Sequence, residues 1–343
     1  MRIMNLFFLV IILTAIFCFS SCTIVTRPSL KQLIAESKNH DGIRVTGFSG
    51  LFSETNVRKR FFGDEAAFLR EVAELLQTGD DTDVWDVGHL ILSLNIEDEN
   101  VSKLLRERFV LSDLGLKENI CILLARHPFT QENFEFLVGV LEQSDHPAVL
   151  RVTVASHLSY SQMEYFEELD AVLKERIINA FLECLDDDRE YQERYGATYK
   201  VGDYVASLIG FFGSFARQAL PKVKTKFMSV QDETEFSSVV NKLRLACSIV
   251  CIVPEQCDDE LQYILQKTTG DGTESVRLVA ISCLEYVPPS LSENVVPILC
   301  ATIQKESNIN MRIGAAKSLE TILSKKASLI DSIAQEQGDD VGE

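Results

Sequence analysis

The chain has 343 residues with a formal net charge of −18, and 46% of its residues are hydrophobic. This apolar content is that of a globular protein. The acidic excess argues against a nucleic-acid partner, because phosphate backbones are bound through clustered Lys and Arg side chains. The sequence holds only 8 Pro, and so few helix breakers favour an all-helical fold.

The first residues have the pattern of a targeting segment. Arg2 precedes a strongly apolar run over 6–19, which is shorter than the roughly 20 residues that a membrane-spanning helix needs. The run ends in the sequence FSSC at 19–22, and small residues directly before a cysteine resemble the lipobox of bacterial lipoproteins. The resemblance implies that residues 1–21 are a signal peptide and that Cys22 carries acyl chains that hold the protein on a membrane. A plain secretion signal and an uncleaved anchor are the alternatives.

Residues 22–63 are expected to form a tether and a small N-terminal cap. Within them, 43–52 is rich in β-type residues and has no helical period. The cluster RKRFF at 58–62 is basic and aromatic in an otherwise acidic protein. Close to a lipid anchor, such a cluster suits contact with the membrane interface or with a partner. Alternatively it is an amphipathic lid on the first helices, with Phe61 and Phe62 buried.

Residues 64–330 show the apolar spacing of amphipathic helices, interrupted at short intervals by turn residues. The helices are expected to come in pairs, because each of them buries only one face. The predicted pairs are 64–77 with 84–94, 99–111 with 116–126, 131–143 with 147–160, 167–185 with 201–215, 221–230 with 233–253, 258–267 with 273–286, and 292–305 with 310–325. Residues 331–343 are polar and are predicted to be a flexible tail.

Three of the predicted second helices share one pattern. Arg151, Arg277 and Arg312 are each followed at +3, +4 and +7 by small or apolar residues, a spacing that lies on one face of a helix. Arg277 and Arg312 are 35 residues apart, which is the length of a repeat made of two helices and their turns.

These second helices, which open with ESVR at 274–277 and INMR at 309–312, resemble those of HEAT and HEAT-like repeats, as does the DHP sequence at 145–147 before Arg151. The resemblance implies an all-α fold, an α-solenoid of about seven antiparallel helix pairs that forms a HEAT- or armadillo-like superhelix. It also implies that Arg151, Arg277 and Arg312 are structural and bond to acids or carbonyls of the neighbouring turn.

Motifs of known catalytic or cofactor chemistry are absent from the sequence, including phosphate loops, nucleophile elbows and HExxH metal sites. We therefore predict no enzyme activity, no cofactor and no metal site. Cys247 and Cys251 share a helix face and Cys257 follows in the next turn, so the three thiols could hold a metal or form one disulfide. We expect them instead to be small buried hydrophobic residues.

The segment 186–203 breaks the helical period and combines acids with tyrosines. Insertions in solenoids map to loops on one face, and Tyr is enriched in binding hot spots. A solvated loop whose tyrosines pack on their own repeat is the alternative. The candidate partner-binding residues are Asp187, Asp188, Glu190, Tyr191, Tyr195 and Tyr199.

The sequence thus predicts a lipid-anchored protein of the bacterial cell envelope that binds or scaffolds a protein partner. The acidic net charge suits a basic partner. Two other functions remain open. One is an enzyme on the same scaffold, resembling lyases that handle bound chromophores, although an exported protein does not suit that role. The other is a purely structural envelope spacer. A resemblance to DNA glycosylases of similar fold is at odds with the acidic charge.

Overall fold

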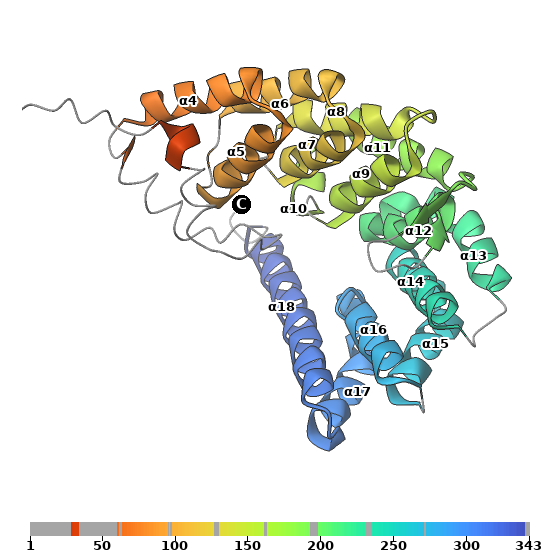
Figure 1. Cartoon of the computed structure of the whole chain (residues 1–343). Helices are drawn as coiled ribbons and strands as arrows, with labels where there is room; N and C mark the ends of the chain where they lie inside the picture. Colours follow the sequence, from red (N-terminus) through yellow and green to blue (C-terminus); the bar gives the residue numbers. More distant parts are fainter. Residues whose placement is uncertain are drawn as a thin grey trace, which may run out of the picture. The chain divides into compact units, whose positions relative to one another are not determined.

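The computed structural model describes residues 29–33, 60–61, 64–94, 96, 98–126, 130–160, 163–192, 198–230, 235–270 and 272–339. The described part is all-α apart from one two-stranded hairpin, which confirms the predicted all-α class (Figure 1). It divides into two compact units, 1–108 and 109–343. The predicted signal peptide 1–21, Cys22, and most of the predicted cap lie outside the described residues.

The first unit contains α4 (Glu65–Thr78) and α5 (Asp81–Leu94), and α6 (Glu99–Leu111) begins in it. The Asp64 side chain accepts a hydrogen bond from the Ala67 amide and so caps α4. Phe61 is buried and its ring packs edge-on against Phe68, with centroids 5.4 Å apart. Phe61 therefore lies as the lid alternative predicts, and Phe62 lies outside the described residues.

Helices account for nearly all of the second unit. They are α7 (Leu114–Arg126), α8 (Gln131–Glu142), α9 (Ala148–Tyr160), α10 (Met163–Phe166), α11 (Ala171–Cys184), α12 (Val201–Leu208), α13 (Leu220–Ser229), α14 (Phe236–Ile252), α15 (Asp258–Thr269), α16 (Glu274–Leu284), α17 (Ser292–Lys305) and α18 (Ile309–Asp339). Short 3₁₀ segments lie at Ile209–Ala219 (η1), Pro254–Gln256 (η2) and Pro289–Leu291 (η3). Most of the predicted helices are found within a few residues of their expected bounds, and the exceptions are α12 and α18.

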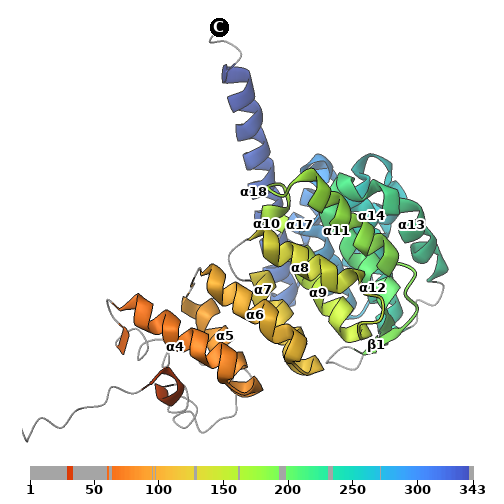
Figure 2. The same ribbon diagram turned by 90° about the horizontal axis from the view of Figure 1, so that it is seen from above.

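The helices of the second unit follow one another in two rows. The second helices of successive pairs pack side by side in the order α7, α9, α12, α14, α16 and α18 (Figure 1 and Figure 2). First helices pack on first helices where α8 contacts α11 and where α15 contacts α17. Each second helix of this unit therefore contacts the second helix of the next pair.

Helix starts are fixed locally by capping side chains. Thr130 accepts a hydrogen bond from the Asn133 amide at the start of α8, and Asp170 accepts one from the Leu173 amide at the start of α11. Thr273 caps α16 in the same way. Such caps satisfy amide groups that have no partner within the helix.

Three elements differ from the sequence-based expectation. The segment 186–203 contains a β-hairpin, and the helix expected over 201–215 changes at Ile209 into the 3₁₀ segment η1. Within η1, Gly213 has a φ of 53°, a conformation that favours glycine. The last helix does not end near Lys325 but continues to Asp339, through part of the segment predicted to be a flexible tail.

Candidate functional site

The segment after α11 folds into a hairpin rather than an open loop. Strand β1 (Glu190–Gln192) pairs antiparallel with β2 (Thr198–Lys200), with Tyr191 opposite Tyr199 and Glu190 opposite Lys200. Successive side chains of a strand point to opposite faces. Tyr191 and Tyr199 therefore share the inner face, while the residues on either side of them in each strand are exposed. The candidate residue Tyr195 lies outside the described residues.

The tyrosines pack on their own repeat, as the alternative in the sequence analysis stated. Tyr199 is buried and Tyr191 half-buried. Their ring centroids lie 6.1 Å and 6.0 Å from that of Tyr204 on α12. The Arg244 guanidinium, from α14, lies 6.0 Å and 5.9 Å from the rings of Tyr199 and Tyr204. The hairpin is thus held to the helices through its aromatic face, and its polar face is the one that a partner would meet.

The Asp187 carboxylate is buried, which corrects the expectation that it contacts a partner. The carboxylate is 6% exposed and forms ion pairs with Arg151 and Arg189. Hydrogen bonding from Arg189 is the main cause that lowers the pKa of Asp187, opposed by burial. The partner that buries Asp187 is 36 residues earlier in the chain, so local sequence does not reveal it.

Among the described residues of the segment, the exposed acids are Asp186, Asp188 and Glu190. The carboxylates of Asp186 and Asp188 are 72% and 81% exposed and pair with Lys222 at 2.6 Å and Lys200 at 3.1 Å. These surface charges are of mixed sign, so the site suits a partner that carries both acidic and basic groups better than a purely basic one.

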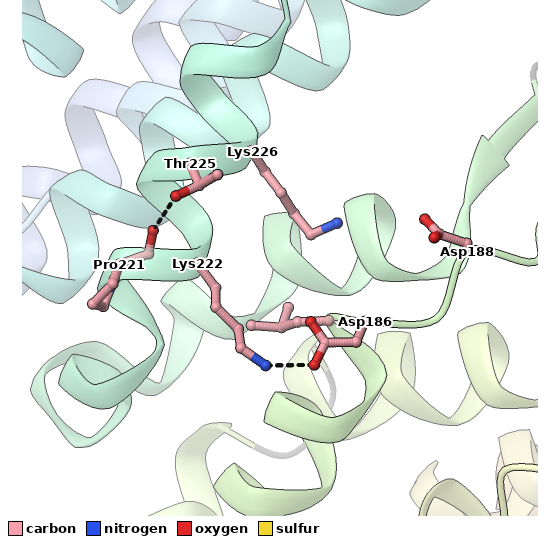
Figure 3. Close-up of a pocket in the computed structure, with 7 residues that line it drawn as sticks. Asp186, Asp188, Pro221, Lys222, Thr225 and Lys226 are labelled. Atoms are coloured by element: carbon pink, nitrogen blue, oxygen red, sulfur yellow. Dashed lines mark hydrogen bonds and ion pairs between the residues drawn. The ribbon is translucent and has the colours of Figure 1, made fainter.

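A solvent-open pocket of about 460 Å³ lies between α13 and the segment. Figure 3 shows Lys222 of α13 reaching Asp186 across one side of it. Lys226, which also lines the pocket, pairs with Asp203 at 2.7 Å. All four charged side chains of the lining form ion pairs: Asp186 and Lys222 pair with each other, while Asp188 pairs with Lys200 outside the lining. Ionisable groups engaged in this way suit surface recognition better than proton transfer. The lining residues are Leu185, Asp186, Asp188, Pro221, Lys222, Thr225 and Lys226.

Two of the three repeat arginines occupy equivalent positions. Arg151 on α9 donates from Nε to the Leu141 carbonyl of α8 at 3.2 Å, and it pairs with Asp187, which follows α11. Arg277 on α16 donates from Nε to the Thr268 carbonyl of α15 at 3.2 Å and pairs with Glu306, which follows α17. Each arginine therefore ties its own first helix to the first helix of the next pair.

Arg312 departs from this pattern, contrary to the expectation that all three arginines are structural. Its side chain is exposed, and within the described part of the chain its guanidinium bonds to no acid or carbonyl. The physical reason is that no described helix pair follows α18 to supply the carboxylate. The acids that pair with Arg151 and Arg277 lie 1 to 3 residues after the end of a first helix. The sequence can reveal this position only when the helix ends are known.

Cys247 and Cys257 are buried, as expected, and Cys251 is half-buried. Cys247 lies with Cys251 and with Cys283 of α16, and hydrogen bonds among them, led by that with Cys251, raise the pKa of Cys247. Burial is the main cause that raises the pKa of Cys257 to about 11. All described cysteines are free. No group of described side chains has the arrangement of a metal site.

Comparisons with known proteins leave the family open. No family model matches the chain, and no curated protein does. A crystal structure of an engineered protein from the Northeast Structural Genomics Consortium is similar over 85% of this chain and 78% of its own, with 13% identity and a TM-score of 0.37.

A search of the described helices for membrane spans found none with the length and apolarity that crossing a bilayer requires.

Proposed function

We propose that the chain is a lipid-anchored α-solenoid that binds a protein partner at the bacterial cell envelope. The observation that carries the proposal is the repeated arginine bridge, in which Arg151 and Arg277 each join a first helix to the next pair. A link that recurs between equivalent elements supports a stack of repeats, and stacked repeats offer extended surfaces for macromolecules.

The polar face of the hairpin is the binding site that we favour. It places Glu190 and Lys200 side by side on an exposed surface, next to the exposed Asp188. The aromatic face beneath fixes the hairpin on α12 and α14, so little conformational freedom is lost when a partner docks. A lyase-like enzyme remains the alternative, and it would require a pocket with unpaired ionisable groups.

Charge reversal tests the binding site. We expect Asp188→Lys combined with Glu190→Lys to reduce recovery of the partner from envelope extracts at least about tenfold, because like charges across an interface are costly. Glu175→Lys is the matched control, since Glu175 is an exposed acid of α11. Equal recovery with both variants would rule out the hairpin surface as the binding site.

The anchor is tested separately through Cys22. Intact mass and detergent partitioning of the protein from its native host should show a lipid-sized increment that Cys22→Ala loses, with the variant moving to the aqueous phase. If both proteins have the same mass and remain in water, the lipoprotein proposal is wrong, while the proposed helical repeats and their binding surface are unaffected.

A further inference from the structure

Helix α18 exposes an apolar stripe along its length. Ile309, Ile313, Leu323 and Ile330 are between 49% and 60% exposed, and their separations of 4, 10 and 7 residues keep the side chains on one helix face. The opposite face of the helix, which includes Met311, Ala315 and Ile322, is buried against the pairs before it. A row of large apolar side chains of this kind marks an interaction surface.

The corresponding face of α16 shows what covers such a surface. When Arg277 is aligned with Arg312, Ile281 of α16 takes the place of Ala316 of α18. Ile281 is fully buried because α18 lies over it, with the Ser318 hydroxyl donating to the Ile281 carbonyl at 3.0 Å. Ala316 is exposed. Helix α18 therefore presents the face on which, one pair earlier, the next helix pair packs.

The charge at this face indicates what its partner must carry. The equivalent arginines, Arg151 and Arg277, each pair with a carboxylate that follows the first helix of the next pair. Arg312 is exposed and meets no such carboxylate among the described residues. An arginine here can bind an incoming acid through a charge-assisted hydrogen bond.

A second copy of the same face suits this surface poorly. If two α18 stripes packed antiparallel about a twofold axis, the positions summing to about 640 would oppose each other, and Glu320 would meet the Glu320 of the other copy. In the same register Arg312 would face Ser328, which supplies no carboxylate for the arginine. The electrostatics therefore favour a partner of different sequence over a symmetric dimer.

The length of α18 leaves room for such a partner. The helix has 31 residues, whereas its packing partner α17 has 14, so at 1.5 Å per residue the two helices span roughly 46 Å and 21 Å. Lys325 of α18 donates a hydrogen bond to the carbonyl of Glu285, directly after α16. The stripe extends past this point to Ile330.

We infer that this face of α18 binds an amphipathic helix of a partner protein, and that this helix carries an acidic residue within one turn of its C-terminal end. The inference deepens the proposed binding function. It can fail separately, because the hairpin variants do not alter α18 and the α18 variants do not alter the hairpin.

Photo-crosslinking of the full chain in its native host tests the inference. The variant Ile313→p-benzoylphenylalanine places a benzophenone on the stripe, and Val172→p-benzoylphenylalanine places one at an exposed apolar position of α11. We expect an adduct at position 313 that is absent at 172 and whose crosslinked peptide, mapped by mass spectrometry, lies in an amphipathic helix with an acid at its end.

A second substitution tests the role of the charge. Arg312→Glu should lower the yield of the adduct at least about tenfold through like-charge repulsion. Arg217→Glu, at another exposed arginine of the second unit, should leave the yield unchanged. An unchanged thermal melting temperature in the Arg312→Glu variant would show that the loss is not due to unfolding.

Several outcomes would overturn the inference. One is an adduct with a second copy of this chain or within the same chain. Another is a yield at position 313 no greater than that at 172. An adduct that persists in full with Arg312→Glu, or that maps to a segment without an acidic helix end, would also contradict it.

Discussion

The pairing of Arg151 with Asp187 shows how one carboxylate fixes several elements at once. Arg151 is 3% exposed and also donates to the Cys184 thiol at 2.9 Å. The Asp187 carboxylate neutralises this arginine and accepts hydrogen bonds from Arg189. Its lowered pKa keeps it in the ionised form. Removing the carboxylate would leave a buried guanidinium without a counter-charge, which costs far more than losing a surface pair.

Asp187→Ala should therefore lower the free energy of unfolding by about 3 kcal/mol. Asp186→Ala is the matched control, since it removes the neighbouring but exposed carboxylate and should cost less than about 1 kcal/mol. Urea denaturation at neutral pH measures both. Similar losses for the two variants would contradict the assignment of Asp187 as a buried structural acid.

His157 makes stability depend on pH. Burial, and secondarily the nearby Arg126, lowers the pKa of His157 to about 4 from the ordinary 6.5. As the pH falls below 6.5 the unfolded chain takes up the proton first, so the folded state loses stability progressively down to about pH 4. We expect a loss of about 1 to 2 kcal/mol between pH 7 and 5 that His157→Gln reduces. Urea denaturation of both proteins at the two pH values tests this, and identical losses would show that His157 is not responsible.

At the scale of elements, the contact between η1 and α14 depends on a missing side chain. The Gly210 amide donates to the Ser248 hydroxyl at 2.7 Å, and a Cβ at Gly210 would clash with Ser248 and lie 2.8 Å from its carbonyl oxygen. The backbone of α14 cannot yield without disturbing the helices packed on its other sides. The close approach of the η1 and α14 backbones therefore requires glycine at position 210.

Gly210→Ala is expected to destabilise the fold by about 2 to 3 kcal/mol through overpacking. Gly115→Ala is the control, because a Cβ there would meet only the Asp113 carboxylate, at 3.7 Å, and alanine favours a helix over glycine by about 1 kcal/mol. Thermal unfolding should thus move in opposite directions for the two variants. A loss of stability in both, or in neither, would refute the packing argument.

The helix pairs were predictable because their apolar faces repeat along the sequence, as in 131–143 and 258–267. The hairpin was not, because its strands have only three residues each and their pairing is set by packing on Tyr204. The extension of α18 was missed because its polar residues resemble those of a tail. At the candidate site the sequence identified the exposed acids Asp188 and Glu190. It did not reveal that the Asp187 side chain points inward, because this direction depends on a distant partner, Arg151.

At the scale of the whole molecule, the second unit is built from contacts between neighbouring pairs. The row of second helices joins each pair to the next, and the arginine bridges do so at two of these junctions. In the proposed solenoid, the free energy of unfolding is approximately the sum of the stability of each repeat and of each contact between neighbouring repeats. A weakened junction should then loosen the repeats beyond it and leave distant repeats unchanged.

Arg277→Ala tests this locality. Its loss removes the pair with Glu306, a charged contact between α16 and the end of α17, and should weaken this junction. Because α17 and α18 form the last described pair, amide hydrogen exchange should become about tenfold faster in these two helices and remain unchanged in α8 and α11. Arg312→Ala removes an exposed arginine at the equivalent position and should leave the exchange rates of all four helices unchanged. Faster exchange throughout the second unit would mean that the pairs unfold as one cooperative body, and the proposed repeat-by-repeat organisation would then be wrong.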